Sequence, residues 1–105
     1  MKGISRILKS GHMPTAFYAA SDLMAMAALR ALYQAKVRVP DDIAVIGMSN
    51  IEMSQYANPP LTTINVPTNE IGFVVAKVLV SRIHGDTSLY KHILLPSELI
   101  ERDSV

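Results

Sequence analysis

Hydrophobic residues gather in short continuous runs and in longer runs at helical spacing. The short runs predict strands, at residues 15–20, 43–47, 61–66, 92–95 and 99–102. The run IAVIG at 43–47 is rich in β-branched residues, which is typical of a strand buried on both faces of a parallel sheet. The short runs therefore predict the strands of a sheet of the kind found in α/β proteins.

Two longer segments, 22–35 and 69–84, predict helices because their apolar residues recur every three or four positions. Ser21 is expected to cap the first helix, and Asp22 lies in its first turn, where a negative charge complements the helix dipole. Gly85 follows the second helix at the position where a left-handed residue ends it.

The order of these elements narrows the topology. Residues 4–10 predict the end of a preceding helix, closed by Gly11. A strand, the helix 22–35 and the strand 43–47 then form a βαβ unit, with a turn signal at 40–42 before the second strand. We expect a parallel sheet flanked by helices.

The helix 22–35 is apolar around most of its surface and has almost no polar residue between Asp22 and Arg30. A helix of this kind has to be covered on more than one side. Burial within one larger domain and burial in an interface between two chains are equally compatible with the pattern.

Composition limits the possible functions. The 105 residues carry ten Lys and Arg against nine Asp and Glu, for a net charge of +1, and they include no cysteine. This length suits one domain at most. The charge balance argues against a dedicated nucleic-acid binder, and the lack of cysteine excludes disulfides, thiol catalysis and cysteine-based metal sites.

Membrane insertion and secretion are not expected either. The longest segments without charge or proline are far shorter than the roughly 18–20 apolar residues of a membrane span. The first dozen residues lack the apolar core and cleavage site of a secretory signal. The sequence predicts a protein of the cytoplasm that makes no contact with a membrane.

Polar pairs follow two of the predicted strands. Ser21 and Asp22 come after the first strand, and Ser49 and Asn50 come after the second. In open α/β sheets, ligands bind beyond the carboxyl ends of the strands, and mixed hydroxyl, carboxylate and amide groups suit a sugar. The alternative is that Ser21 and Asn50 only cap helices.

Catalytic and metal chemistry have little support. His12, His84 and His92 are scattered without the spacing of metal ligands, and the glycines form no phosphate-binding loop. The segment Gly47-Met48-Ser49 does not complete a nucleophile motif, because residue 51 is isoleucine. We expect no enzyme activity, no metal and no cofactor.

Several segments, in order and at matching spacing, resemble the lactose/galactose repressor family of bacterial transcription regulators. They are PTAFYAASDLMA at 14–25, ALRAL at 28–32, VPDDIAVIG at 39–47, PPLTTI at 59–64 and LPSELIERDSV at 95–105. The resemblance implies that residues 1–105 form the C-terminal portion of an effector-binding domain with a type I periplasmic-binding-protein-like fold. It places the crossings between the two lobes near 66–68 and 95–98.

The resemblance also implies partners. The parent would be a homodimer joined through helix 22–35. Because this helix is apolar around most of its surface, we expect Met24, Met26, Arg30 and Tyr33 near the two-fold axis. A small effector, a sugar, would switch the dimer between states with different affinity for operator DNA. DNA would be contacted only through an N-terminal headpiece that this sequence lacks, as it lacks the first lobe.

Effector residues carry over by position. Ser21 stands where the family has asparagine, Ser49 where it has a ligand-binding aspartate after an aromatic residue, and Asn50 at the next polar position. Val66 and Thr68, at a crossing, are further candidates. The alternative is a portion of a periplasmic sugar-binding protein of the same fold, although the 39–42 segment and the C-terminal residues favour the regulator.

Overall fold

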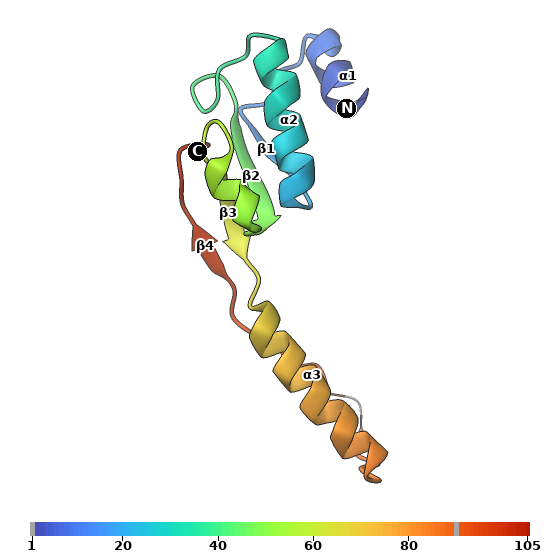
Figure 1. Cartoon of the computed structure of the whole chain (residues 1–105). Coiled ribbons are helices and arrows are strands. Elements are labelled where there is room, and N and C mark those ends of the chain that lie inside the picture. The colour runs from blue at the N-terminus through green and yellow to red at the C-terminus, as the bar shows by residue number, and fades with distance from the viewer. Residues whose placement is uncertain (1, 90) are drawn as a thin grey trace. The chain divides into compact units, whose positions relative to one another are not determined.

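The computed structural model describes residues 2–89 and 91–105. Three helices, one 3₁₀ helix and four strands lie in this part of the chain (Figure 1). In chain order they are α1 Lys2–Ser10, β1 Ala16–Tyr18, α2 Asp22–Gln34, β2 Ala44–Ser49, the 3₁₀ helix η1 Glu52–Tyr56, β3 Thr62–Asn65, α3 Thr68–Ile83 and β4 Glu98–Ile100. The helices over 22–35 and 69–84 and the turn at 40–42 are therefore where the sequence predicts them.

The chain forms two compact units. The first comprises Met1–Asn65 and Glu98–Val105, and it contains the sheet. The second comprises Val66–Ser97 and contains α3. The boundaries between these units fall close to 66–68 and 95–98. That these segments are crossings between the lobes of a complete sensor stays a prediction.

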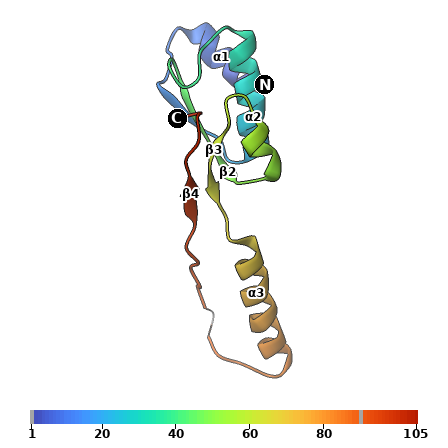
Figure 2. The same ribbon diagram turned by 60° about the vertical axis from the view of Figure 1, so that its left-hand side comes forward.

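The sheet of the first unit has the order β1-β2-β3-β4. β1, β2 and β3 are parallel, with Phe17 opposite Val45 and Gly47 opposite Thr63. β4 runs antiparallel to β3, and Figures 1 and 2 both show these two strands side by side. The predicted α/β class, a largely parallel sheet flanked by helices, is confirmed.

Helix α2 covers the sheet with one face only. Its Ala25 and Leu32 are fully buried, and they join Ile43, Val45 and Leu61 in the core of the unit. The opposite face of α2 stays exposed and is partly apolar; it includes Leu23, Met24, Arg30 and Tyr33. The core therefore accounts for the buried face of α2, whereas the apolar side chains of the opposite face are exposed in the single chain.

The second unit is built differently. α3 ends at Ile83, and the Arg82 guanidinium closes the following loop by donating to the carbonyl oxygens of Asp86, at 3.2 Å, and Leu89, at 3.1 Å. Gly85 has a φ of 99°, as its predicted stop position requires. No residue of α3 is buried, although many of its side chains are apolar.

One predicted strand is wrong. Residues 91–97 contain no strand, so the expectation at 92–95 fails, whereas the expected strand at 99–102 is present as the shorter β4. The pattern HILL is apolar enough for a strand, but a strand also needs a hydrogen-bonded neighbour.

Within the described residues, no helix is long and apolar enough to cross a membrane.

Candidate functional site

The two predicted polar pairs follow strands that are neighbours in the sheet, because β1 pairs with β2. Ser21 is the N-cap of α2, and its Oγ accepts a hydrogen bond from the Met24 amide at 3.3 Å. The structure therefore supports the capping interpretation of Ser21.

Asp22 lies fully buried at the start of α2. Its Oδ1 accepts a hydrogen bond from Thr63 Oγ1 at 2.5 Å, and its Oδ2 accepts one from the Ile51 amide at 2.8 Å. The carboxylate therefore ties α2 to β3 and to the loop that follows β2. Hydrogen bonds to a carboxylate are stronger than those between neutral groups, so this residue fixes the loop.

The loop after β2 has an unusual backbone. Ser49 has a φ of 119° and Asn50 has a φ of 53°, both in the region that residues other than glycine rarely adopt. Two hydrogen bonds hold the loop at this point: the one from the Ile51 amide to Asp22, and one from the Asn50 amide to Thr63 Oγ1 at 3.3 Å. The bend leaves the Ser49 side chain exposed.

Asn50 does not act as a helix cap. The N-cap of η1 is Ile51, which makes no side-chain capping bond. The Asn50 amide nitrogen instead donates to Asn65 Oδ1 at 3.0 Å, and its Oδ1 accepts from Arg102 Nη2 at 3.0 Å and from Ser54 Oγ at 3.5 Å. The capping interpretation of Asn50 is wrong because its side chain is bound to β3 and to the C-terminal segment.

The structure brings Asp22 and Asn50 together through a shared partner, Thr63, while Ser49 lies exposed beside them in the chain. Val66 and Thr68 belong to the second unit. Both oxygens of Asp22, and both the oxygen and the nitrogen of the Asn50 side chain, already bond to the protein itself. Their part in a ligand site stays a prediction.

Three residues that bond to Asp22 or Asn50 are not predicted by the sequence analysis: Thr63, Asn65 and Arg102. Thr63 and Asn65 alternate along β3, so they share one face of the strand and approach its carboxyl end. That signal was present in the segment LTTIN. No such signal marks Arg102, because the residues that it contacts lie about half the chain length away in sequence.

The polar groups at the carboxyl ends of β2 and β3 are hydroxyls and carboxamides, with the charge of Asp22 buried behind them. These groups, with the Arg102 guanidinium bound to Asn50, offer paired donors and acceptors, which suits a polyhydroxylated molecule. Within residues 2–89 and 91–105, no group of three or more His, Cys, Asp or Glu side chains is placed to hold a metal ion.

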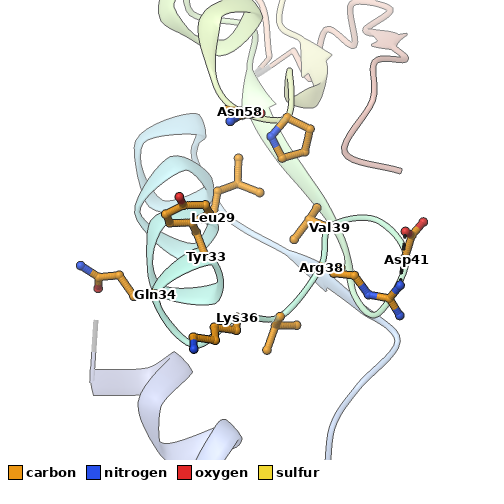
Figure 3. A pocket seen from close by; sticks show the side chains of 10 residues that line it. Leu29, Tyr33, Gln34, Lys36, Arg38, Val39, Asp41 and Asn58 are labelled. Atoms are coloured by element: carbon orange, nitrogen blue, oxygen red, sulfur yellow. Dashed lines mark ion pairs between the residues drawn. The ribbon is translucent and has the colours of Figure 1, made fainter.

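A hollow of about 730 Å³ lies at the other end of the sheet (Figure 3). It is formed by the last turns of α2, the loop that precedes β2, and the Asn58-Pro59 segment; Leu29, Tyr33 and Val39 line it. Because it adjoins the amino end of β2, it is not where an α/β sheet holds its ligand. Ser21, Asp22, Ser49 and Asn50 do not line it.

A smaller hollow of about 250 Å³ shares part of this surface. It is lined by Met26, Leu29, Arg30, Tyr33, Ala57 and Asn58. Three of the four residues predicted to lie near a two-fold axis are therefore grouped around one depression on the exposed side of α2.

Comparison with known proteins identifies the family. The model of the periplasmic binding protein-like domain matches residues 1–105. The transcriptional repressor MelR of Bacillus subtilis is 43% identical over 101 residues, which are 96% of this chain and 29% of the relative. The ribose operon repressor of Escherichia coli is 43% identical over 91 residues, which are 87% of this chain and 28% of the relative.

Solved structures agree. A complex of the transcriptional regulator CelR with cellobiose matches with a TM-score of 0.91 and 38% identity, over 99% of this chain and 32% of that one. A lac repressor dimer bound to operator and an anti-inducer matches with a TM-score of 0.89 and 33% identity, over 98% of this chain and 36% of that one.

The chain thus spans about three-tenths of the length of the curated relatives that it matches. These relatives are transcriptional repressors and regulators, and the periplasmic sugar-binding alternative is not favoured. The chain belongs to the periplasmic binding protein-like domain family, and it is part of the effector-binding domain of a regulator of the lactose/galactose repressor family.

Proposed function

We propose that the complete protein is a cytoplasmic transcriptional repressor whose sensor domain binds a sugar, and that it is not an enzyme. The observation that carries this proposal is the match of the whole chain to a sensor family whose similar members are repressors. CelR in complex with cellobiose and the ribose operon repressor make a sugar the favoured class of effector. The neutral polar groups beyond β2 and β3 fit that class.

The effector site is proposed at the carboxyl ends of β1, β2 and β3. Ser49 supplies an exposed hydroxyl there. Ser21, Asp22 and Asn50 shape the site by holding α2 and the loop in place. Val66 and Thr68 belong to the proposal as residues of a crossing between lobes.

The exposed face of α2 is proposed as the homodimer interface, with Met24, Met26, Arg30 and Tyr33 near the two-fold axis. Tyr33 is 76% exposed and Met24 is 55% exposed in the single chain. Large apolar and aromatic side chains that stand exposed together mark association surfaces, and tyrosine and arginine often dominate their energetics. A lac repressor dimer is one of the similar solved structures.

Operator DNA is proposed to be contacted outside this chain. The net charge of +1 gives the 105 residues no strong attraction for phosphates, on which DNA affinity largely depends. Sugar binding would then act on DNA affinity as a coupling between two separate sites.

The test is calorimetric titration of the complete protein with cellobiose, D-ribose, D-glucose and D-galactose, alongside operator binding. Ser49→Ala should weaken binding of the responsive sugar while operator affinity without sugar is unchanged. Ser10→Ala, which alters an exposed serine at the end of α1, is the matched control. Absence of binding by every sugar would refute a sugar effector of this kind.

A further inference from the structure

Arg102 anchors a chain of hydrogen bonds that reaches the candidate site. Its Nη1 donates to Leu61 O at 2.8 Å and to Ser54 Oγ at 2.9 Å. Its Nη2 donates to Asn50 Oδ1 at 3.0 Å, and the Asn50 amide nitrogen donates to Asn65 Oδ1 at 3.0 Å. We call the series from Arg102 through Asn50 to Asn65 the amide relay.

The chemistry of its first member fixes the direction of the relay. A guanidinium group has five donors and no acceptor, so only an oxygen of Asn50 can face it. The amide nitrogen of Asn50 must then face Asn65, where only an oxygen can accept its hydrogen bond. Each carboxamide orientation is therefore determined by the donor-only guanidinium, and the nitrogen of Asn65 becomes the free end.

The free end lies at the candidate site. Asn65 is the last residue of β3 and pairs in register with Ser49, the last residue of β2. Its side chain is only half-buried, and within the described part of the chain its amide nitrogen has no hydrogen-bond partner. Two N–H donors and the exposed Ser49 hydroxyl therefore stand at the same register position of adjacent parallel strands.

We propose that Asn65 binds the effector directly, by donating hydrogen bonds to an oxygen acceptor of the sugar, and that Arg102 is the positioning residue that turns these donors toward it. The proposal rests on the proposed function and deepens it, because it names the group that the ligand must offer: a hydroxyl or ring oxygen in the acceptor role. A ligand group that can only donate would face the Asn65 nitrogen, which is itself a donor, and could form no hydrogen bond with it.

A merely structural role for Arg102 predicts something different. Its bonds to Leu61 and Ser54 hold the C-terminal segment against the sheet whether or not a ligand binds. Loss of Arg102 then lowers stability and affects sugar binding only through unfolding. Variants that leave these two bonds intact separate the two roles.

The main experiment measures sugar affinity by calorimetry on the complete protein, with the sugars of the panel above as probes. Asn65→Asp keeps the oxygen that accepts from Asn50 and replaces the free donors with a negatively charged oxygen. Asn50→Asp keeps the acceptor for Arg102 but removes the donor to Asn65, which reverses the relay. Both variants are expected to lose at least tenfold in affinity for the responsive sugar, with a thermal midpoint near that of the wild type.

Arg102 is tested by rescue. Arg102→Met should weaken sugar binding several-fold and also lower the thermal midpoint, because the bonds to Leu61 and Ser54 are lost. Arg102→Lys retains a donor-only cation and should recover affinity more fully than it recovers stability. Asn69→Asp, which alters an exposed asparagine in the first turn of α3, is the matched control and should not change the relay.

A second readout needs no ligand. In protein labelled with ¹⁵N at asparagine, the side-chain amide protons of Asn65 should exchange rapidly with water, while one amide proton of Asn50 should be protected. The Asn50→Asp variant should slow exchange at Asn65, because its nitrogen then turns toward the new carboxylate.

The outcomes are distinguishable. Sugar binding by the wild type together with less than twofold loss in Asn65→Asp and Asn50→Asp overturns this inference and leaves the proposed function standing. If no sugar binds the wild type, the proposed function fails, and the exchange measurement then tests whether the amide relay has the proposed direction. Protected Asn65 protons in the wild type would then overturn it, and rapidly exchanging ones would support it.

Discussion

The carboxylate of Asp22 occupies the space that a side chain at residue 47 would need. A Cβ built on Gly47 collides with Asp22 Oδ1 and also comes within 3.0 Å of Leu61 Cδ2. Gly47 lies in β2 under the first turn of α2, so its lack of a side chain allows Asp22 to reach across to Thr63 and Ile51. A glycine in one strand thus permits the buried contact that fixes the loop of the candidate site.

Gly47→Ala is therefore expected to destabilise the protein by about 1–3 kcal/mol, the usual range for overpacking a close-packed site. Urea unfolding followed by circular dichroism measures this change. Gly72→Ala is the matched control, because Gly72 lies within α3 and its added methyl meets no atom within 4 Å. That substitution should raise stability by about 0.5–1 kcal/mol through helix propensity. Equal effects of the two substitutions would contradict the packing argument.

The sequence predicts the main elements because their signals are local. The cap at Ser21 and the spacing of apolar residues in 22–35 place α2 to within one residue of its observed end. The strand expected at 92–95 is absent because apolar character alone does not supply a pairing partner.

Only part of the candidate site can be predicted from the sequence, for a related reason. Ser49 and Asn50 follow a recognisable strand, so their position could be inferred. Arg102 is 52 positions from Asn50 in sequence, and no local pattern reports a contact of that separation. The antiparallel return of β4 alongside β3 accompanies this contact, and the expected fifth strand carried no direction.

Arg38 lowers the pKa of Asp42 on the loop that precedes β2. The Arg38 side chain donates to Asp42 Oδ1 at 3.0 Å and its backbone amide donates to Oδ2 at 2.8 Å, and both favour the ionised carboxyl. An NMR titration should therefore find the pKa of Asp42 below the ordinary value of about 3.9. A depressed pKa in the folded state adds stability that is complete above the ordinary value and is lost as pH falls through the folded value.

Arg38→Gln should raise the pKa of Asp42 only part of the way to its ordinary value, since the backbone hydrogen bond remains. Asp86 is the matched control. Its pKa is lowered chiefly by the backbone amide of Ser88, which donates to Oδ1 at 2.9 Å, so the Arg38 substitution should leave it low. An Asp42 pKa that did not move in the variant would show that Arg38 is not the cause.

The exposed face of α2 makes a prediction about self-association. Tyr33→Ser should weaken dimerisation of the complete protein at least tenfold, because tyrosine side chains in the centre of an interface commonly dominate its binding energy. Sedimentation velocity over a range of concentrations measures the effect. Leu89→Ser is the matched control, since Leu89 is 89% exposed but lies in the second unit. A dimer unaffected by Tyr33→Ser would place the interface elsewhere.

Ser104 holds the last residues of the chain between β2 and β3. It is fully buried, its Oγ accepts from the Thr62 amide at 2.8 Å, and the same Oγ donates to Val45 O. Its backbone adds two more bonds, from the Val45 amide to Ser104 O at 2.9 Å and from the Ser104 amide to Pro60 O at 3.0 Å. Side-chain and backbone bonds of Ser104 can therefore be separated by substitution.

Ser104→Ala removes only the side-chain oxygen and leaves the buried Thr62 amide without an acceptor, which costs about 1–3 kcal/mol. We expect this loss of stability in urea, with no such loss for the exposed Ser97→Ala. Hydrogen exchange separates local from global effects: the Thr62 amide should exchange faster, whereas the Val45 amide keeps its bond to the backbone of residue 104. If both amides accelerated equally, the whole C-terminal segment would have detached, and Ser104 would then act as the anchor of Arg102 and of the amide relay as well.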